Sequence, residues 1–125
     1  MVALAAGGAL ALTGRGRLRR IEVAGPSMIP TLAPGERLLV VPRWRRLLPG
    51  DLVALRDPDL PKRLLIKRVD KVTRDGVIVR GDNPSASRDS RDFGAVTLGS
   101  IVGLAVYRYH PADRAGGLAP RRRIA

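Results

Sequence analysis

The chain has 125 residues, of which 45% are hydrophobic, so it can bury the core of one ordinary domain. It has no cysteine and a single histidine, His110, which excludes disulfides, thiolate metal sites and a histidine-cluster metal site, and we expect neither metal nor cofactor. The formal net charge of +12 comes mostly from arginine and favours an anionic neighbour, either lipid headgroups or nucleic acid, although a GC-rich genome also produces such a composition.

Residues 1–13 are apolar and carry no charged side chain, and a basic cluster follows at 15–20. The apolar run is shorter than the roughly 20 residues that span a bilayer as a helix. A secretory signal has its basic residues before the apolar region, not after it. Residues 1–20 are therefore interpreted as a short or truncated membrane anchor, an interfacial helix, or a loose apolar tail. If they span, the basic cluster predicts a cytoplasmic catalytic domain, and the alternative is a domain that faces the extracytoplasmic side.

Short β-branched and leucine-rich runs separated by turn residues predict a mainly β domain over residues 21–110. Asp75-Gly76 predicts a hairpin turn, and no long amphipathic helix pattern follows residue 20. Residues 111–125 are polar, contain proline and glycine, and are predicted to form a flexible basic tail. The predicted strands cover residues 21–24, 37–41, 51–55, 64–69, 76–80 and 100–107.

The segment 25–32 reads Gly-Pro-Ser-Met-Ile-Pro-Thr-Leu and directly follows the first predicted strand. Pro26 and Pro30 stiffen this backbone, so Ser27 is held at a strand end. A serine between proline and glycine commonly caps a turn. The competing interpretation is a nucleophile, which requires a base elsewhere in the chain.

Lys67 is a candidate for that base. If its strand alternates regularly, Leu65, Lys67 and Val69 share one face, and the lysine points the same way as two large apolar side chains. Burial lowers the pKa of a lysine, and a neutral amine can accept a proton, which an arginine cannot. The alternative is an edge-strand lysine whose amine reaches solvent. A serine and a desolvated lysine together form a nucleophile and base that need no histidine.

Residues 43–46 read Arg-Trp-Arg-Arg. Such a run forms a solvated loop between strands, places a tryptophan at a membrane interface, or stacks on a nucleic-acid base. The sequence alone leaves these three interpretations open.

Four motifs in order resemble the type I signal peptidases, which are Ser–Lys serine proteases that remove leader peptides. The motifs lie at 27–32, 49–53, 67–69 and 81–94, and the resemblance covers residues 21–110. On composition alone, residues 81–94 also fit a polar surface loop. The resemblance implies a small, partly open β-barrel. Within this family, the chain is most similar to the proteases that mature nickel-type superoxide dismutase by trimming its propeptide. The features shared with them are the short chain, the Gly-Pro-Ser-Met segment at 25–28 and the Asp-Ser-Arg-Asp-Phe-Gly segment at 89–94.

This resemblance implies a role for each matching residue. Ser27 is the nucleophile and Lys67 the general base, with the Ser27 backbone N–H in the oxyanion hole. Gly25 occupies the position where some members supply a second, hydroxyl donor, and Ser87 occupies that of a serine which orients the lysine. The shallow pocket for small side chains before the scissile bond is lined by Val23, Met28, Leu32 and Ile66. The structural residues are Asp82 and Asn83, which have turn chemistry, and the ion pair of Asp89 and Arg91.

The predicted function is removal of an N-terminal leader or propeptide from a precursor protein, with association with the membrane. The candidate substrates are a nickel-type superoxide dismutase precursor and exported preproteins. The main rival is a non-catalytic basic β-barrel that binds nucleic acid or an anionic membrane, and the few aromatic residues argue against nucleic acid. The other rivals are a self-cleaving Ser–Lys repressor-type protein, for which residues 1–20 are too short to hold a DNA-binding module, and an inactive scaffold.

Overall fold

The computed structural model describes residues 17–118. The apolar segment 1–13 and the last residues of the predicted tail, 119–125, lie outside the described residues, so the expectations about them stay predictions. Among the described residues, no helix is both long and apolar enough to cross a bilayer.

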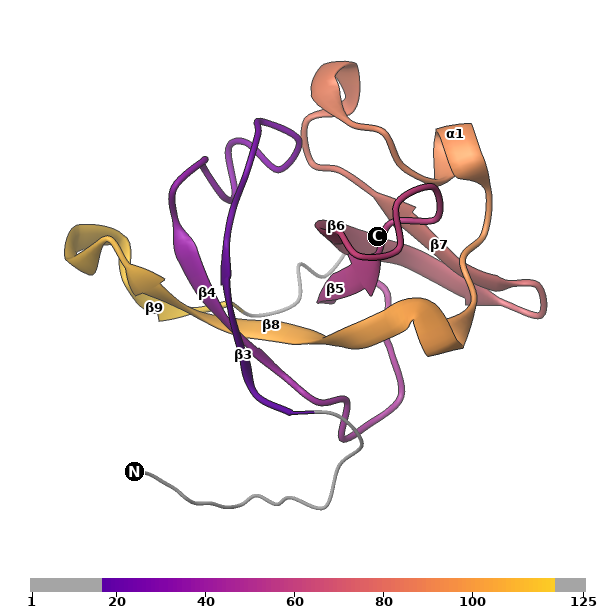
Figure 1. Ribbon diagram of the computed structural model, residues 1–125, viewed down its shortest axis with the longest axis horizontal. Coiled ribbons are helices and arrows are strands. Elements are labelled where there is room, and N and C mark those ends of the chain that lie inside the picture. The colour runs from indigo at the N-terminus through magenta and orange to yellow at the C-terminus, as the bar shows by residue number, and fades with distance from the viewer. Residues whose placement is uncertain (1–16, 119–125) are drawn as a thin grey trace, which may run out of the picture.

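The described residues form a seven-stranded antiparallel sheet with the order β3-β4-β8-β5-β6-β7, and β9 pairs with β8 (Figure 1). The outer strands β3 and β7 do not pair with each other, so the barrel is open, and the prediction of a mainly β, partly open barrel is confirmed. The strands are β3 (Arg19–Glu22), β4 (Arg37–Val41), β5 (Leu52–Arg56), β6 (Leu64–Thr73), β7 (Gly76–Arg80), β8 (Ile101–His110) and β9 (Gly116–Gly117). The short helices are η1 (Pro84–Ala86), α1 (Ser90–Phe93), η2 (Leu98–Ser100) and η3 (Ala112–Arg114).

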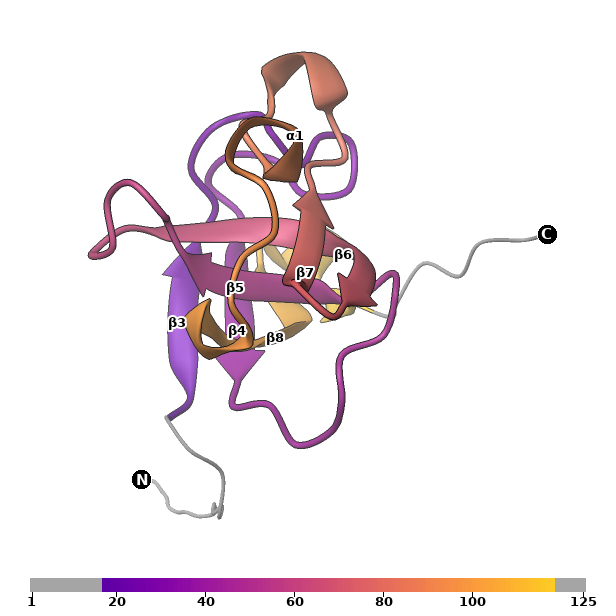
Figure 2. The same cartoon turned by 90° about the vertical axis from the view of Figure 1, so that its right-hand side faces the viewer.

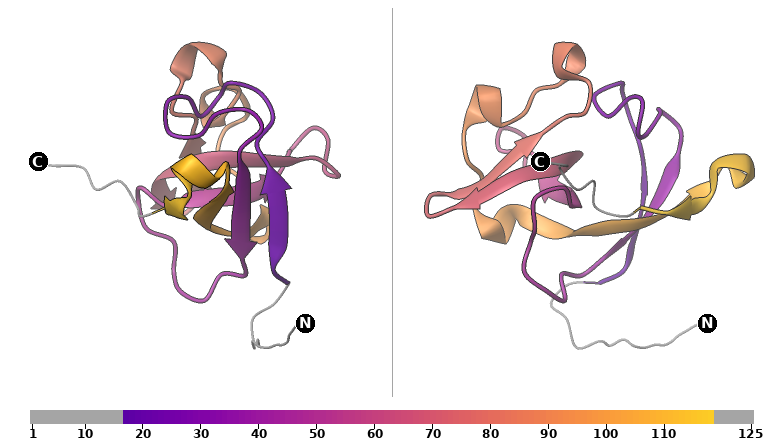
Figure 3. Two further views of the ribbon diagram at one scale, coloured as in Figure 1. Left: turned by 90° about the vertical axis from the view of Figure 1, so that its left-hand side faces the viewer. Right: turned by 180° about the vertical axis from the view of Figure 1, so that it is seen from behind.

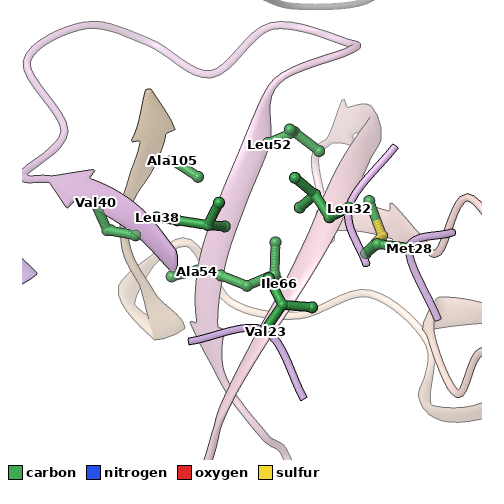
Figure 4. Packing of buried hydrophobic residues seen from close by; sticks show 9 residues of the cluster. All are labelled: Val23, Met28, Leu32, Leu38, Val40, Leu52, Ala54, Ile66 and Ala105. Carbon is green, nitrogen blue, oxygen red and sulfur yellow. The ribbon is translucent and has the colours of Figure 1, made fainter. Parts of the chain in front are cut away.

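The central strand β5 contributes to two hydrophobic clusters. Successive side chains of a strand point to opposite faces. Leu52 and Ala54 therefore pack in the first cluster, and Val53 and Leu55 in the second. Because both faces of β5 are covered, its sequence is a continuous apolar run. Figure 4 shows the first cluster, which consists of Val23, Met28, Leu32, Leu38, Val40, Leu52, Ala54, Ile66 and Ala105.

The strand pairings place the site at one end of the barrel. Strands β3 and β4 are antiparallel, and their loop, residues 23–36, carries Ser27. The hairpin predicted at Asp75-Gly76 joins β6 to β7, with Thr73 opposite Gly76. The β7–α1 connection, which carries Ser87, lies beside the Ser27 loop in both Figure 1 and Figure 2.

The segment after β8 is ordered further than the sequence predicted. Residues 111–118 form η3 and β9 in place of the expected flexible tail (Figure 3). Gly117 pairs with Tyr107 of β8. The Leu118 N–H donates to the Val106 carbonyl at 2.9 Å, and its side chain packs against the first cluster. The η3 residue Arg114 pairs with the buried carboxylate of Glu36, a long-range contact that the local composition of the segment does not reveal.

Candidate active site

A groove of about 220 Å³ lies between the end of β3 with its following loop and the first half of β6. Ser27 and Lys67 both line it, although 40 positions separate them in the chain. The fold therefore brings the two candidate catalytic residues to one site. Other predicted site residues that line the groove are Val23, Gly25, Met28 and Ile66.

The backbone around Ser27 is fixed by contacts with the β7–α1 connection. The Asn83 backbone N–H donates to the Ser27 carbonyl at 2.9 Å, and the Asn83 side-chain amide donates to the Pro26 carbonyl at 3.0 Å. Within residues 17–118, neither Oγ nor the backbone N–H of Ser27 has a hydrogen-bond partner. Both groups are therefore available to a bound peptide, the hydroxyl as a nucleophile and the N–H as an oxyanion donor.

Two glycines near Ser27 are required by backbone geometry. Gly25 has a φ of +79°, in the left-handed region that strains other residues, which disfavours a side-chain donor at this position. A Cβ on Gly81 would lie 2.1 Å from Oγ of Ser87 and 2.7 Å from the Ser27 carbonyl oxygen. Gly81 therefore lets the β7–α1 connection approach Ser27 closely. Gly81 lies in the motif at 81–94, but the sequence alone indicates no role for it, because only the folded structure reveals this approach.

Lys67 is buried, with only 3% of its surface exposed. Its amine donates to Ser87 Oγ at 3.0 Å and forms no ion pair with a carboxylate of the described residues. Burial is the main cause that lowers the pKa of Lys67, and the positive charges of Arg88, Arg63 and Arg91 lower it further, whereas Asp89 opposes the shift. The environment thus favours the neutral amine, the form that can accept a proton.

Ser87 connects Lys67 to the buried carboxylate of Asp89. The Ser87 hydroxyl donates to Asp89 Oδ2 at 2.9 Å, which turns a hydroxyl lone pair toward the lysine amine. Asp89 also accepts from the Gly81 N–H at 2.8 Å and from the Arg91 guanidinium at 2.8 and 2.9 Å. Although burial opposes it, the hydrogen bonds from Arg91, Gly81 and Ser87 hold the pKa of Asp89 far below its usual range. The ion pair expected between Asp89 and Arg91 is present beside Ser87.

Asp82 belongs to a second network that braces the loop after Ser27. It accepts from Arg68 Nε at 2.9 Å and Nη2 at 2.7 Å, and it also accepts from the Thr31 hydroxyl. Arg68 Nη1 donates to the Gly50 carbonyl at 2.8 Å. Arg68 lies in the motif that contains Lys67, but the sequence analysis assigned it no role. Its partners Asp82 and Gly50 lie in two other segments of the chain, and only the folded structure brings them to Arg68.

The apolar residues predicted to bind the substrate form part of the first hydrophobic cluster. Val23, Met28 and Ile66 line the groove, which gives its floor an apolar character close to Ser27. Leu32 belongs to the same cluster, is fully buried and is not one of the groove residues, so the structure places it in support of the floor (Figure 4).

Arg63 and Arg88, which the sequence analysis did not identify, stand at the rim of the groove. Both pair with the buried Asp57, and Arg88 also pairs with Asp59 at 2.9 Å. The β5–β6 loop is therefore tied to the β7–α1 connection above the site.

An open antiparallel barrel with an unpartnered serine and a buried lysine in one groove has the architecture of a signal peptidase-like serine peptidase. The family model described as Peptidase S24-like matches residues 9–102, and the chain belongs to this family. Relatives include the mitochondrial ATP-independent inner membrane protease subunit 1b of Arabidopsis thaliana, which is 36% identical over 77% of this chain and 72% of the relative. Mitochondrial inner membrane protease subunit 2 of Mus musculus is 31% identical over 74% of this chain and 67% of its own length. Signal peptidase I of Leptolyngbya laminosa is 43% identical over a shorter match, 41% of this chain and 25% of the relative.

Proposed function

We propose that the chain is a serine endopeptidase in which Ser27 and Lys67 form a catalytic dyad that removes an N-terminal leader from a precursor protein. The observation that carries the proposal is the burial of Lys67 in the same groove as an unpartnered Ser27 hydroxyl. A buried amine that forms no direct ion pair is costly, and such groups concentrate at sites where their chemistry is used.

In this mechanism, neutral Lys67 takes the proton of the Ser27 hydroxyl as Oγ attacks the carbonyl carbon of the scissile peptide bond. The backbone N–H of Ser27 stabilises the negative charge on the carbonyl oxygen. The lysine then gives its proton to the leaving amine, which produces an acyl-enzyme and releases the part of the precursor after the cleaved bond. A water molecule that gives its proton to Lys67 attacks the ester, and the proton returns to Ser27 as the leader departs.

The hydrogen bond from Lys67 to Ser87 supports this assignment because it fixes the direction of the amine. Asp89 orients the Ser87 hydroxyl, so the Lys67 amine always has Ser87 Oγ as one hydrogen-bond acceptor. When Lys67 is neutral, the lone pair of its amine nitrogen can accept a hydrogen bond from another group in the groove. Ser87 is therefore proposed as a positioning residue for the base.

The substrate is proposed to be a precursor with a small side chain before the scissile bond, because Val23, Met28 and Ile66 restrict the apolar floor of the groove. Relatives named as inner membrane protease subunits and signal peptidase I support a leader-bearing precursor. A nickel-type superoxide dismutase precursor is the second candidate, favoured by the compact chain and the motifs at 25–28 and 89–94. We also propose that the chain associates with a membrane, which the names of these relatives support. In this proposal the catalytic domain lies on the cytoplasmic side.

The test is cleavage of both candidate precursors by the wild type, Ser27→Ala and Lys67→Met. Ser100→Ala and Lys71→Met are matched controls, because they make similar changes outside the groove. Loss of cleavage in the two dyad variants, with control activity and circular dichroism unchanged, is the expected result. Activity that survives in Ser27→Ala or Lys67→Met contradicts the dyad, and the precursor that is cleaved identifies the substrate class.

A further inference from the structure

The loop between β4 and β5, residues 42–51, holds an exposed tryptophan in a fixed position. Trp44 is 63% exposed, and Leu48 from the same loop is 44% exposed. The conformation of the loop is stabilised by the buried carboxylate of Asp51 and not by these two exposed side chains. Arg45 donates to both carboxylate oxygens of Asp51, at 2.8 and 2.9 Å, and the Leu48 N–H donates to the same carboxylate at 2.8 Å.

These contacts leave Trp44 and Leu48 facing outward on a rigid loop. Leu47, between them, points inward and is 6% exposed in the second hydrophobic cluster. The Arg45 guanidinium lies 5.3 Å from the centre of the Trp44 ring, which further restricts the ring. Exposed apolar side chains that gather on one surface mark an interaction site more often than single ones do, and this loop exposes both Trp44 and Leu48.

The start of β3 lies at the same end of the barrel as this loop. Arg19 pairs with Val40 near the end of β4, so the chain before Arg19 runs alongside the beginning of the loop. Figures 1 and 2 both show the start of β3 and the loop at the lower end of the molecule, opposite the loop that carries Ser27. Leu18 is 57% exposed there. We call the side chains of Arg17, Leu18, Arg43, Trp44, Arg46 and Leu48 the basal surface.

The basal surface combines apolar side chains with uncompensated positive charge. Arg17, Arg43 and Arg46 are not paired with a carboxylate of the described residues. Moreover, the apolar run 1–13 and Arg15 precede the first described residue, Arg17, so residues 1–16 join the described fold at this surface. Tryptophan prefers the headgroup level of a bilayer, and arginine is attracted to anionic lipid.

We propose that the basal surface rests on an anionic lipid bilayer, with Trp44 and Leu48 at the level of the headgroups. Nucleic acid fits less well, because base stacking normally uses several aromatic side chains and this loop offers one. The orientation has a consequence for substrates. β3 has four residues and a length of roughly 13 Å, and it leads from the bilayer to the loop that carries Ser27. A cleavable bond must therefore extend at least that far from the bilayer surface.

Trp44 is the single tryptophan of the chain, so its fluorescence reports on this surface alone. The experiment adds the full chain to vesicles of phosphatidylcholine, and to vesicles in which part of this lipid is replaced by anionic phosphatidylglycerol. We expect a blue shift of Trp44 emission with the anionic vesicles and quenching by brominated acyl chains. Binding of the chain to vesicles with unchanged Trp44 emission overturns the proposal, because the bilayer contact then lies elsewhere.

A matched pair of double variants separates this surface from the general positive charge. Arg43→Gln/Arg46→Gln should weaken binding to the anionic vesicles about thirty-fold, since each arginine near a charged bilayer contributes on the order of five-fold. Arg56→Gln/Lys62→Gln removes the same charge at the other end of β5 and should change binding much less. Equal weakening by both pairs, or a larger Trp44 response to a single-stranded oligonucleotide than to the vesicles, contradicts the proposal. These outcomes do not depend on peptidase activity, so they are separate from the test of the dyad.

Discussion

Lys67 and Glu36 are ionisable residues buried to the same extent, since each exposes 3% of its surface, but their surroundings differ. The Glu36 carboxylate accepts from the Ala33 N–H at 3.0 Å and pairs with Arg108 at 3.1 Å and with Arg114. The Lys67 amine has a neutral hydroxyl as its hydrogen-bond partner and no carboxylate partner among the described residues. Glu36 therefore has direct ion-pair partners, and Lys67 has none among the described residues.

The two environments shift the two pKa values by different causes. Burial alone would raise the pKa of Glu36, but the hydrogen bonds from Ala33 and Arg114 and the charge of Arg108 hold it below its usual range. For Lys67, burial itself lowers the pKa, the charge of Asp89 opposes this shift, and neighbouring arginines add to it. Glu36 stays charged and stabilises the fold, whereas Lys67 is pushed toward the neutral form that a general base requires. Burial without a direct ion pair therefore supports the proposed role of Lys67 as a general base.

The largest expected effect on activity comes from Lys67→Met. Removing a general base lowers the rate of peptide cleavage by about 10²–10⁴-fold. Because methionine needs no hydration, the free energy of unfolding should stay equal to that of the wild type or rise. Cleavage kinetics and urea denaturation measure the two quantities, with Lys71→Met as the control on the same strand. A variant that retains activity, or one that loses stability strongly, would show that Lys67 is structural.

The largest expected effect on stability comes from Glu36→Ala. The substitution leaves Arg108 and Arg114 without their buried partner, and removal of one member of a buried pair costs about 3–5 kcal/mol. Glu22→Ala is the matched control, because Glu22 forms an exposed pair with Arg37 at 3.6 Å, worth less than about 1 kcal/mol. Urea denaturation of both variants tests the difference, and equal losses would remove the contrast.

The pH dependence of stability should have two separate limbs. The folded-state pKa values of Glu36, Asp57 and Asp89 are lowered, so the unfolded chain binds more protons in acid, and stability is lost as the pH falls below about 4. The pKa of Lys67 is also lowered, so stability rises with pH from that folded-state pKa to the unfolded value of about 10.4. Chemical denaturation across this range should show the alkaline rise in the wild type and its absence in Lys67→Met. A wild-type curve that is flat between neutral pH and 10 would contradict the lowered pKa.

A smaller effect is expected from Ser87→Ala. The variant keeps Lys67 buried but removes its acceptor and one of the donors to Asp89. We expect kcat to fall on the order of ten-fold with little change in KM, and stability to fall by about 1 kcal/mol. Ser87→Thr should restore part of kcat, because its hydroxyl can make the same bonds. Equal changes in kcat and KM would indicate that Ser87 affects binding and not the orientation of the base.

The approximate positions of the strands could be predicted from the sequence, because β-branched runs and the turn residues between them are local signals. The face shared by Leu65, Lys67 and Val69 was likewise predictable from alternation, and the burial of Lys67 agrees with that prediction. The ordered segment 111–118 was not predictable, because it depends on Arg114 reaching Glu36 across 78 positions. The role of Gly81 was hidden for the same reason, since Ser27 lies beside Gly81 only in the folded chain.

The central claim is that Lys67 is the neutral base of the site, and NMR titration of lysine side chains tests it most directly. With ¹³C-labelled lysine, the spectrum reports Lys62, Lys67 and Lys71, the three lysines of the chain, and the Lys67→Met variant identifies the signal of Lys67. If Lys67 is the neutral base, it titrates below the usual lysine value of about 10.4, at the pH where the rate of precursor cleavage rises. A Lys67 signal that titrates at or above that value would show that the residue is not the neutral base.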